Sequence, residues 1–361
     1  MFEKRFKAHF DWTLVVSMLV ATSLGLLVLY SATYLEGAEL FWRQITWLMI
    51  GLVALVLVLA VDYHTWSYIA LPAYILSCLA LIAVLYQARA IGGARSWFEL
   101  GFFNFQPAEL AKLATILLLA RFVEERKGFG LSGPSLLSLV VIVAVPVALI
   151  AAQPDLGSTL PFLPLLFVVI VLSGIRWKAL MVMGLVVVLL VPITFYLLEP
   201  YQQERVLTYV DQMSDPQGVG WQVLQSRIAV GSGGVWGKGL FRGWQGQLSF
   251  LPESHTDFIL SVLAEELGFA GTVCALIVYF VLLSRIVAAA RGARDKLGAF
   301  IAMGVAAVIG SQVLVNIGVI LGLIPTTGIT LPLMSYGGSS LVTTLVGLGL
   351  VLNVRMRCLV N

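Results

Sequence analysis

Four polar or ionisable side chains gather in a short segment that directly precedes one of the most apolar runs of the chain. The segment LPESHTDF contains Glu253, His255, Thr256 and Asp257, and the run ILSVLAEELGFAGTVCALIVYFVLL follows it. A helix start needs only one capping carboxylate, so Asp257 is a candidate for chemistry as well as for capping. One histidine beside acids is a weak zinc signal, because zinc takes more nitrogen or sulfur ligands. A Mg²⁺-like ion shared by Asp257 and a substrate phosphate stays open as an alternative.

A second cluster places an acid and a base inside an apolar helix. In the stretch GGARSWFELGFFNFQPAELAKLA, Pro107 suits the first turn of a helix, so Glu109 and Lys112 lie three residues apart on one helix face. At about 1.5 Å per residue, Lys112 lies roughly 8 Å into that helix. Charges at this depth are costly unless they face a polar cavity or each other. The two residues are therefore either a self-satisfying ion pair or functional charges, and Arg95 is either an interfacial anchor or a functional cation.

Two further polar segments lie between apolar runs. In QPDLGS, Asp155 either caps the next helix or takes part in a site. In LIPTTGITLPLMSYGGSSLV, two glycines precede Ser339 at a helix start, where free N–H groups bind anions well. A flexible turn with an N-cap explains the same pattern equally well.

The composition identifies a membrane protein. Hydrophobic residues make up 60% of the 361 positions, charged residues make up 11%, and the mean hydropathy is +0.97. A soluble domain has roughly twice that charged fraction, and runs of about 20 apolar residues recur along the chain. We therefore expect one all-α polytopic membrane domain over residues 1–361, with no nucleic acid as a partner. The apolar runs predict ten transmembrane helices, at about residues 12–31, 43–61, 66–87, 107–124, 134–152, 158–173, 178–198, 257–284, 297–323 and 339–354.

Ten helices place both termini on the same side, and the basic residues decide which side that is. Of the 22 Lys and Arg residues, 14 fall on the terminal side and 7 on the opposite side, with Lys112 inside a predicted helix. Because basic residues accumulate on the cytoplasmic side, both termini are predicted to be cytoplasmic. Residues 199–256 then form a long extracytoplasmic loop between helices 7 and 8, and the polar clusters described above share that outer face.

The long loop contains two recognisable segments. WQVLQSRIAV places Trp221, Leu224 and Ile228 on one helical face, which predicts a short amphipathic helix that lies on the membrane or covers a cavity. GSGGVWGKG lacks the pattern of a phosphate-binding Walker loop, so its glycines are expected to let the backbone turn tightly or approach a ligand closely. Together, the carboxylates, cations and glycine-rich turns of the outer face suit an anionic, lipid-linked substrate better than a small ion.

Four segments resemble, in order and spacing, the signature segments of the SEDS family (shape, elongation, division and sporulation proteins), which includes RodA, FtsW and SpoVE. These segments are GGARSWFELGFFNFQPAELAKLA, QPDLGS, LPESHTDFILSVLAEELGFAG and GLIPTTGITLPLMSYGGSS. The resemblance extends over nearly the whole chain. The short loops and short N-terminus are more similar to the RodA branch than to the FtsW branch.

The resemblance implies a peptidoglycan glycosyltransferase of the cell membrane. Such an enzyme polymerises lipid II into glycan strands on the outer face during cell elongation and shape determination. The implied partners are lipid II, the growing glycan strand, a class B penicillin-binding protein and other membrane proteins of the elongation machinery. The essential aspartate of the family falls on Asp257, its conserved glutamate and lysine fall on Glu109 and Lys112, its arginine falls on Arg95, and the acid of its Q-P-D-L-G motif falls on Asp155.

Read back onto the residues, the implied reaction assigns roles. Asp257 is expected to take the proton of the acceptor GlcNAc 4-hydroxyl in a single displacement that inverts the anomeric carbon. Cations stabilise the departing diphosphate, with or without a divalent ion such as Mg²⁺ or Mn²⁺, and Glu109 orients Lys112. The residues expected to bind the substrate and its diphosphate are Arg95, Glu109, Lys112, Asp155, Arg205, Arg227 and Ser339.

Two other functions compete with catalysis. A lipid II flippase or transporter would have polar groups that reach both membrane faces and a pair of helices broken at mid-membrane. A non-enzymatic scaffold for a penicillin-binding protein would leave the buried charges of Lys112 and Glu109 without a purpose. The clustering of polar motifs on one face favours an enzyme.

Overall fold

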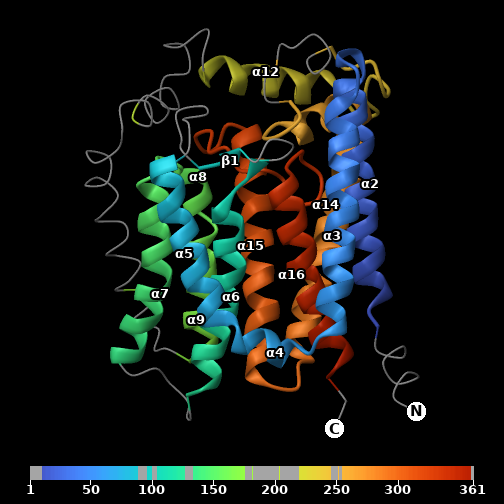
Figure 1. Ribbon diagram of the computed structural model, residues 1–361. Helices are drawn as coiled ribbons and strands as arrows, with labels where there is room; N and C mark the ends of the chain where they lie inside the picture. The colour runs from blue at the N-terminus through green and yellow to red at the C-terminus, as the bar shows by residue number, and fades with distance from the viewer. Residues whose placement is uncertain are drawn as a thin grey trace.

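The fold is a bundle of mostly upright helices with one helix, α12, lying across one end (Figure 1). The computed structural model describes residues 10–87, 96–99, 104–126, 133–174, 181, 203, 219–244, 251 and 254–358. Its elements are α2 (Trp12–Thr33), the 3₁₀ turn η1 (Tyr34–Glu36), α3 (Glu39–Ala60), α4 (Tyr63–Tyr68), α5 (Ala70–Gln87), β1 (Phe98–Glu99), β2 (Asn104–Phe105), α6 (Pro107–Glu124), α7 (Gly133–Ala151), α8 (Leu156–Thr159), α9 (Phe162–Leu172), α12 (Val219–Ser232), α14 (Ile259–Arg291), α15 (Lys296–Ile320) and α16 (Gly338–Met356).

The helices confirm a mostly helical, multi-pass membrane protein. Within the described residues, six helices are long and apolar enough to cross a membrane, namely α2, α3, α7, α14, α15 and α16. Helices α5, α6 and α9 also coincide with predicted spans, but α5 and α9 are shorter and α6 carries several charged residues. The predicted span 178–198 lies outside the described residues except for Met181. The count of ten spans therefore stays a prediction.

A small antiparallel pair of strands interrupts the all-helical pattern that the sequence predicts. Phe98 in β1 pairs with Phe105 in β2, and Glu99 pairs with Asn104. Both strands lie in the segment predicted to connect two spans, directly before Pro107 begins α6. The pair therefore fixes the chain at the point where α6 enters the bundle.

Helix α15 occupies the centre of the bundle and packs against α6, α9, α14 and α16, while α16 packs against α3 and α14 packs against α2 (Figure 1). Small residues allow these close contacts, as is common between membrane helices. A Cβ atom at Gly304 of α15 would lie 2.9 Å from the Ile116 side chain of α6, and one at Gly25 of α2 would lie 2.4 Å from Met334. Helices α6 and α15 therefore pack closely at Ile116, one turn along α6 from Lys112.

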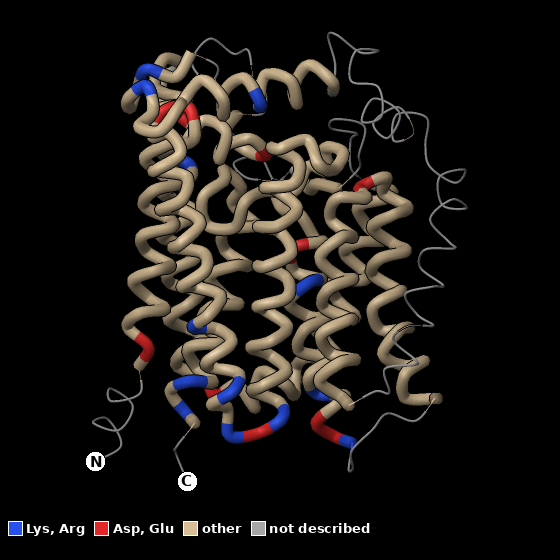
Figure 2. The backbone as a smooth tube through the Cα atoms, turned by 180° about the vertical axis from the view of Figure 1, so that it is seen from behind, with Lys and Arg blue, Asp and Glu red and all other residues tan. Residues whose placement is uncertain are grey.

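Basic residues gather at the end of the bundle where α16 ends (Figure 2). Helices α6, α14 and α16 end there and α2 and α15 begin there, so the described chain starts and finishes at one end (Figure 1). The Lys and Arg residues at these helix ends are Arg121, Arg126, Arg291, Arg294, Lys296, Arg355 and Arg357. The opposite end carries α12 and the turn that precedes α14.

Helix α14 is broken at Gly268, whereas the sequence predicts an uninterrupted span over 257–284. Gly268 has φ 68° and ψ −166°, which lies outside the helical region. The break frees backbone groups on both sides, and the glycine-rich segment 233–239 pairs with them. Gly234 and Val235 accept hydrogen bonds from the N–H groups of residues 269 and 270 at 2.9 and 3.0 Å, and residues 238 and 239 donate to the carbonyls of residues 265 and 266 at 3.0 and 2.9 Å. The glycines of this segment were predicted to let the backbone approach a ligand closely. The backbone that they approach is instead that of α14 on both sides of its break.

The break also determines where two buried acids, Glu265 and Glu266, lie. A straight helix would place Glu265 and Glu266 about 12–14 Å inside the membrane at 1.5 Å per residue. Instead, Ser31, two residues before the end of α2, donates a 2.5 Å hydrogen bond to Glu266 Oε1, and Lys238 Nζ lies 2.6 Å from Glu265 Oε1. Both carboxyl groups are thus buried at the end of the bundle opposite the chain termini.

Helix α12 covers the bundle end with a face that the sequence did not identify. Ser226 Oγ lies 2.8 Å from Ser261 Oγ and donates to the carbonyl of Ile320 at 3.2 Å, so α12 contacts both α14 and α15. Ser226 and Gln225 are buried, whereas Leu224 and Ile228 of the predicted apolar face are 46% and 44% exposed. The predicted helix is present, but the face that contacts the protein is mixed, with Val223 and Ala229 buried beside Gln225 and Ser226.

The break in α14 predicts a specific sensitivity to substitution. We expect Gly268→Ala to destabilise the protein, because the backbone strain alone costs about 1–3 kcal/mol and the new Cβ would lie 2.3 Å from the backbone nitrogen of Gly237. Gly310→Ala in α15 is the matched control, since its Cβ would meet Leu283 at an ordinary 3.7 Å. Thermal unfolding in detergent should show a lower Tm for Gly268→Ala only; equal Tm values for the two variants would contradict this account of the break.

Candidate functional site

Asp257 lies one residue before the cap of α14 and is not itself that cap. The helix begins at Ile259 with Phe258 in the N-cap position, and the side chain of Phe258 makes no capping hydrogen bond. The N-cap position considered for Asp257 is therefore occupied by the next residue. The side chain is partly buried, and the first turn of α14, which follows it, contacts α12 through Ser261. Glu253 of the same motif lies outside the described residues.

Hydrogen bonds tie the segment around Asp257 to the irregular segment between α15 and α16. The amide of Asn316 in α15 donates to the carbonyl of Asp257 at 2.8 Å and to that of Ile329 at 3.0 Å. Ser335 Oγ donates to the carbonyl of Thr256 at 2.5 Å, and the N–H of residue 336 donates to the carbonyl of His255 at 2.9 Å. The backbone on both sides of Asp257 is therefore held in place by partners from two elements.

Glycine allows two loops to meet beside the Asp257 carboxylate. A Cβ at Gly328, where φ is +72°, would lie 3.9 Å from Asp257 Oδ2. A Cβ at Gly157 would lie only 1.8 Å from the carbonyl oxygen of Thr327. The QPDLGS turn, which contains Asp155, therefore lies against Thr327, and the turn that contains Asp257 lies near the next residue, Gly328. Both turns thus meet the segment between α15 and α16.

Asp155 caps α8 and also accepts a hydrogen bond from α6. Its Oδ1 accepts from the N–H of Ser158 at 3.1 Å, and its Oδ2 accepts from Ser158 Oγ at 2.8 Å and from Gln106 Nε2 at 3.1 Å. Ser339 Oγ accepts from the N–H of Gln106 at 3.2 Å and donates to the carbonyl of Asn104 at 3.2 Å. The capping interpretation of Asp155 is confirmed, and Ser339 holds α16 against the start of α6.

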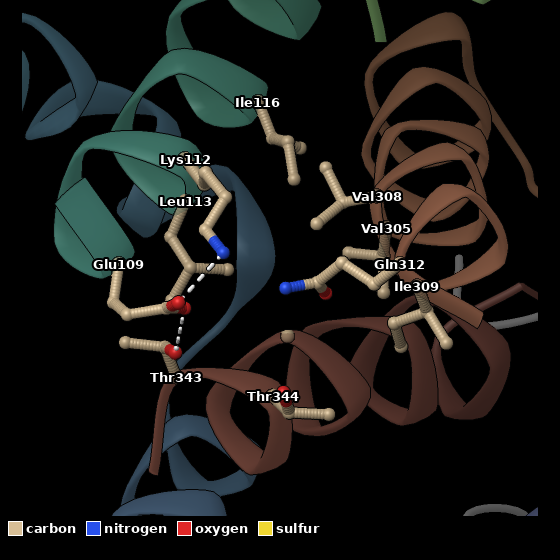
Figure 3. A pocket seen from close by; sticks show the side chains of 11 residues that line it. Glu109, Lys112, Leu113, Ile116, Val305, Val308, Ile309, Gln312, Thr343 and Thr344 are labelled. Carbon is tan, nitrogen blue, oxygen red and sulfur yellow. Dashed lines mark hydrogen bonds and ion pairs between the residues drawn. The ribbon is translucent and has the colours of Figure 1, made fainter. Parts of the chain in front are cut away.

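Glu109 and Lys112 form a buried ion pair that lines a pocket between α6, α15 and α16 (Figure 3). Lys112 Nζ lies 2.8 Å from Glu109 Oε1, and Thr343 Oγ1 donates to Glu109 Oε2 at 3.0 Å. The side chain of Gln312 points into the same pocket from α15, opposite Lys112 (Figure 3). The remaining lining residues are Leu113, Ile116, Val305, Val308, Ile309, Thr344 and Gly347, so these polar groups face each other in apolar surroundings.

Of the three arginines predicted to bind the diphosphate, only Arg227 lies within the described residues. Arg227 of α12 donates to the carbonyls of Leu321 and Gly322 at 3.1 and 3.2 Å, directly after the end of α15. Its guanidinium therefore holds α12 onto the bundle through carbonyl groups that a helix end leaves unpaired. Arg95 and Arg205 lie outside the described residues.

Sequence reasoning missed Gln312, Asn316 and Thr343. Gln312 and Asn316 lie four residues apart on one face of α15, inside a run that is otherwise apolar. Polar residues within membrane helices usually face the bundle interior and mark functional positions. That spacing was visible in the sequence and would have identified both residues.

Two groups can do chemistry here, the partly buried Asp257 carboxylate and the Glu109–Lys112 pair of the pocket, whose lining does not include Asp257. They are linked through α15, because Gln312 lines the pocket and Asn316, one turn farther along, bonds to the Asp257 carbonyl. Gln106, the N-cap residue of α6, bonds to Ser339 of α16, and Glu109 of α6 bonds to Thr343 of α16. Because Gln106 also bonds to Asp155, the same two helices position the Asp155 turn and the Lys112 pocket. A carboxylate suits proton abstraction, and a cation in apolar surroundings suits the stabilisation of developing negative charge.

The comparisons with known proteins cover nearly the whole chain. A sequence model of the FtsW, RodA and SpoVE family of cell cycle proteins matches residues 11–358. The peptidoglycan glycosyltransferase MrdB of Escherichia coli strain K12 is 39% identical over 354 residues, which covers 97% of this chain and 94% of MrdB.

Solved structures match over the same extent. A chain from a peptidoglycan synthase complex that coordinates polymerization and crosslinking superposes with a TM-score of 0.84 at 39% identity, covering 98% of this chain and 99% of that chain. The rod shape determining protein RodA of Thermus thermophilus superposes with a TM-score of 0.74 at 35% identity, covering 98% of each chain.

The buried pair predicts a strongly non-additive response. Glu109→Gln leaves the Lys112 ammonium buried without its counter-charge, which costs about 3–5 kcal/mol, and the double change Glu109→Gln/Lys112→Met should recover most of that loss. Glu39→Gln breaks the exposed Glu39–Arg43 pair and serves as the control, with little expected effect. Thermal unfolding of the parent, the single variants Glu109→Gln and Lys112→Met, the double variant and the control measures the coupling. Additive losses in the double variant would show that the two charges do not depend on each other.

Proposed function

Because the chain belongs to the FtsW, RodA and SpoVE family of cell cycle proteins, we propose that it is a peptidoglycan glycosyltransferase that polymerises lipid II into glycan strands. The observation that carries this proposal is the 39% identity to the peptidoglycan glycosyltransferase MrdB over nearly the full length of both chains. The site is consistent with it. A carboxylate, a buried cation and apolar helices suit a lipid-linked substrate that carries a diphosphate.

Asp257 is the proposed general base. Transfer of a sugar from a lipid diphosphate requires removal of a proton from the attacking hydroxyl, and a carboxylate held near that hydroxyl performs this step. Clamping of the backbone by Asn316 and Ser335 favours this role, because a fixed base does not have to be ordered in the transition state. A single displacement inverts the anomeric carbon and needs no second carboxylate as a nucleophile.

Lys112 is the proposed cation for the departing diphosphate. An ammonium has three donors, and the ion pair with Glu109 orients it toward the pocket. Gln312 and Thr343 would add neutral hydrogen-bonding groups at the same place. Arg95 and Arg205 remain proposed contacts of the diphosphate. For Arg227, Asp155 and Ser339, the contacts favour the positioning of α12, α8 and α16 over direct contact with the substrate.

Asp257 could supply one carboxylate ligand to a divalent ion such as Mg²⁺ or Mn²⁺, but not a complete set of ligands. Among the described residues, the single group of three clustered metal-ligand side chains does not include Asp257. An ion at Asp257 would therefore depend on phosphate oxygens of the substrate for most of its ligands, as magnesium commonly does. Its contribution would be neutralisation of the diphosphate charge.

The orientation follows from the distribution of basic residues. Lys and Arg gather at the end where the described chain starts and finishes (Figure 2), and such an end usually faces the cytoplasm. Asp257 would then lie on the outer side of the cell membrane, where a translocated lipid-linked substrate is available.

A class B penicillin-binding protein is the proposed partner. The matching chain comes from a complex that carries out both polymerization and crosslinking, and a transpeptidase supplies the second activity. The similarity to a rod shape determining protein favours a role in cell elongation, together with other membrane proteins of the elongation machinery.

The flippase and scaffold alternatives are outcomes of one experiment. The purified protein is reconstituted in vesicles with labelled lipid II, and glycan strands, transfer of label across the bilayer, or neither are measured. We expect glycan strands. Transfer without polymerisation would support the flippase, and neither product in the presence of the partner would support the scaffold.

The base assignment predicts a loss of turnover. Asp257→Asn keeps the size of the side chain but removes the proton acceptor, so the polymerisation rate should fall by roughly 10²–10⁴-fold. Glu39→Gln changes an exposed acid at the same end of the bundle and should leave the rate unchanged. Polymerisation of labelled lipid II by purified proteins measures both. A wild-type rate for Asp257→Asn would refute the assignment.

A further inference from the structure

A second group of ionisable side chains lies at the opposite end of the bundle from Asp257. His64 comes from α4, Glu124 is the last residue of α6, and Asp295 is the N-cap of α15. One ligand atom from each residue lies within 4.8 Å of the others. All three side chains are only partly buried, so an ion from solution can reach them.

The imidazole of His64 lies between two carboxylates. Its Nδ1 is 2.8 Å from Asp62 Oδ1, and its Nε2 is 3.0 Å from Asp295 Oδ2. A neutral imidazole has one N–H donor and one acceptor nitrogen, so a neutral ring would turn a lone pair toward one of these carboxylates. The contact between Nε2 and Asp295 therefore has room for one further cation, which is either a proton shared by the two groups or a metal ion.

The contacts of Asp62 determine which ring nitrogen of His64 is free to bind a cation. Asp62 is fixed by the backbone N–H of His64, which donates to its Oδ1 at 2.9 Å, and by Arg357 Nη1, which donates to its Oδ2 at 2.9 Å. A fixed carboxylate that accepts from Nδ1–H leaves the Nε2 lone pair directed toward Asp295 and Glu124. Metal-binding histidines usually donate their second N–H to a carboxylate in this way.

The distances suit a metal ion. Two ligands that each lie about 2.1 Å from a metal are separated by about 3.0 Å at octahedral angles and by about 3.4 Å at tetrahedral angles. Nε2 and Asp295 Oδ2 are 3.0 Å apart, which is within reach of both geometries. Tyr63 O–H donates to the same Oδ2 at 2.5 Å, and Asp295 Oδ1 accepts from the N–H of Gly298 at 2.8 Å. The Asp295 carboxylate is thus oriented by neighbours on two elements. A proton would satisfy only the contact between His64 Nε2 and Asp295 Oδ2. A metal ion at the same place would also be bound by the carboxylate of Glu124.

We propose that His64 Nε2, Glu124 and Asp295 bind a divalent first-row metal ion such as Zn²⁺ at the end of the bundle opposite Asp257. One imidazole and two carboxylates are ligands that such ions accept, with water in the remaining positions. The ion joins α4, α6 and α15. Because α6 carries Lys112 and α15 carries Asn316, it holds together the two helices that position the site at the other end.

Co²⁺ is the probe for this site, because its visible absorption reports coordination by nitrogen and oxygen ligands. The experiment uses the full chain in detergent with affinity tags removed and with Asp257→Asn in every protein, so that an ion at the proposed active site does not contribute. We expect one Co²⁺ per chain, displaced by Zn²⁺, and a Tm that rises when the metal is added.

Matched variants locate the ion. Glu124→Gln and His64→Gln should each weaken Co²⁺ binding by at least about tenfold, whereas Glu125→Gln, which changes the neighbouring acid paired with Arg121, should leave it unchanged. Size-exclusion profiles identify any variant that fails to fold, and Glu124→Gln suffices if His64→Gln does so. Absence of Co²⁺ binding up to on the order of 1 mM, as expected for a ring that holds two protons, overturns the proposal. Equal affinity in parent and Glu124→Gln proteins also overturns it.

Discussion

A polypeptide that crosses a membrane must pair its backbone polar groups within the protein, because lipid offers no hydrogen-bonding partners. This constraint explains the irregular parts of the fold. Where α14 breaks at Gly268, the segment 233–239 supplies the missing donors and acceptors. Where the chain between α15 and α16 leaves helical geometry, Asn316 and Ser335 pair its carbonyl and N–H groups and those of the Asp257 turn. Non-helical backbone is tolerated here because protein surrounds it, and it brings side chains from distant parts of the sequence together.

The electrostatics of the site follow from the same packing. Lys112 and Glu109 are buried side chains that satisfy each other at 2.8 Å, and burial makes an ammonium a stronger partner for negative charge than it would be in water. The carboxylate of Asp257 lies in a turn and not inside a helix, so its position is set by contacts with two other segments. A fixed base and a desolvated cation are the parts that sugar transfer from a lipid diphosphate requires.

Local patterns predicted much of the fold, and tertiary contacts decided the rest. The ranges 12–31 and 107–124 were recovered because length, apolar composition and Pro107 at a helix start are local signals. The i, i+3 spacing placed Glu109 and Lys112 on one helix face, and the ion pair that it allowed is present. The break in α14 was missed because its partners lie some thirty residues earlier in the sequence. The buried face of α12 was missed because it mixes Val223 and Ala229 with Gln225 and Ser226, and the search for an apolar face passes over a mixed one.

The central claim is that Asp257 acts on the attacking hydroxyl and does not serve mainly to bind substrate. The most direct test measures lipid II binding and single-turnover polymerisation separately in the Asp257→Asn protein. The account predicts that lipid II binding stays within a few-fold of the parent while glycan formation falls by at least about 10²-fold. Loss of binding that fully accounts for the loss of glycan formation, or formation of glycan at the parent rate, would contradict it.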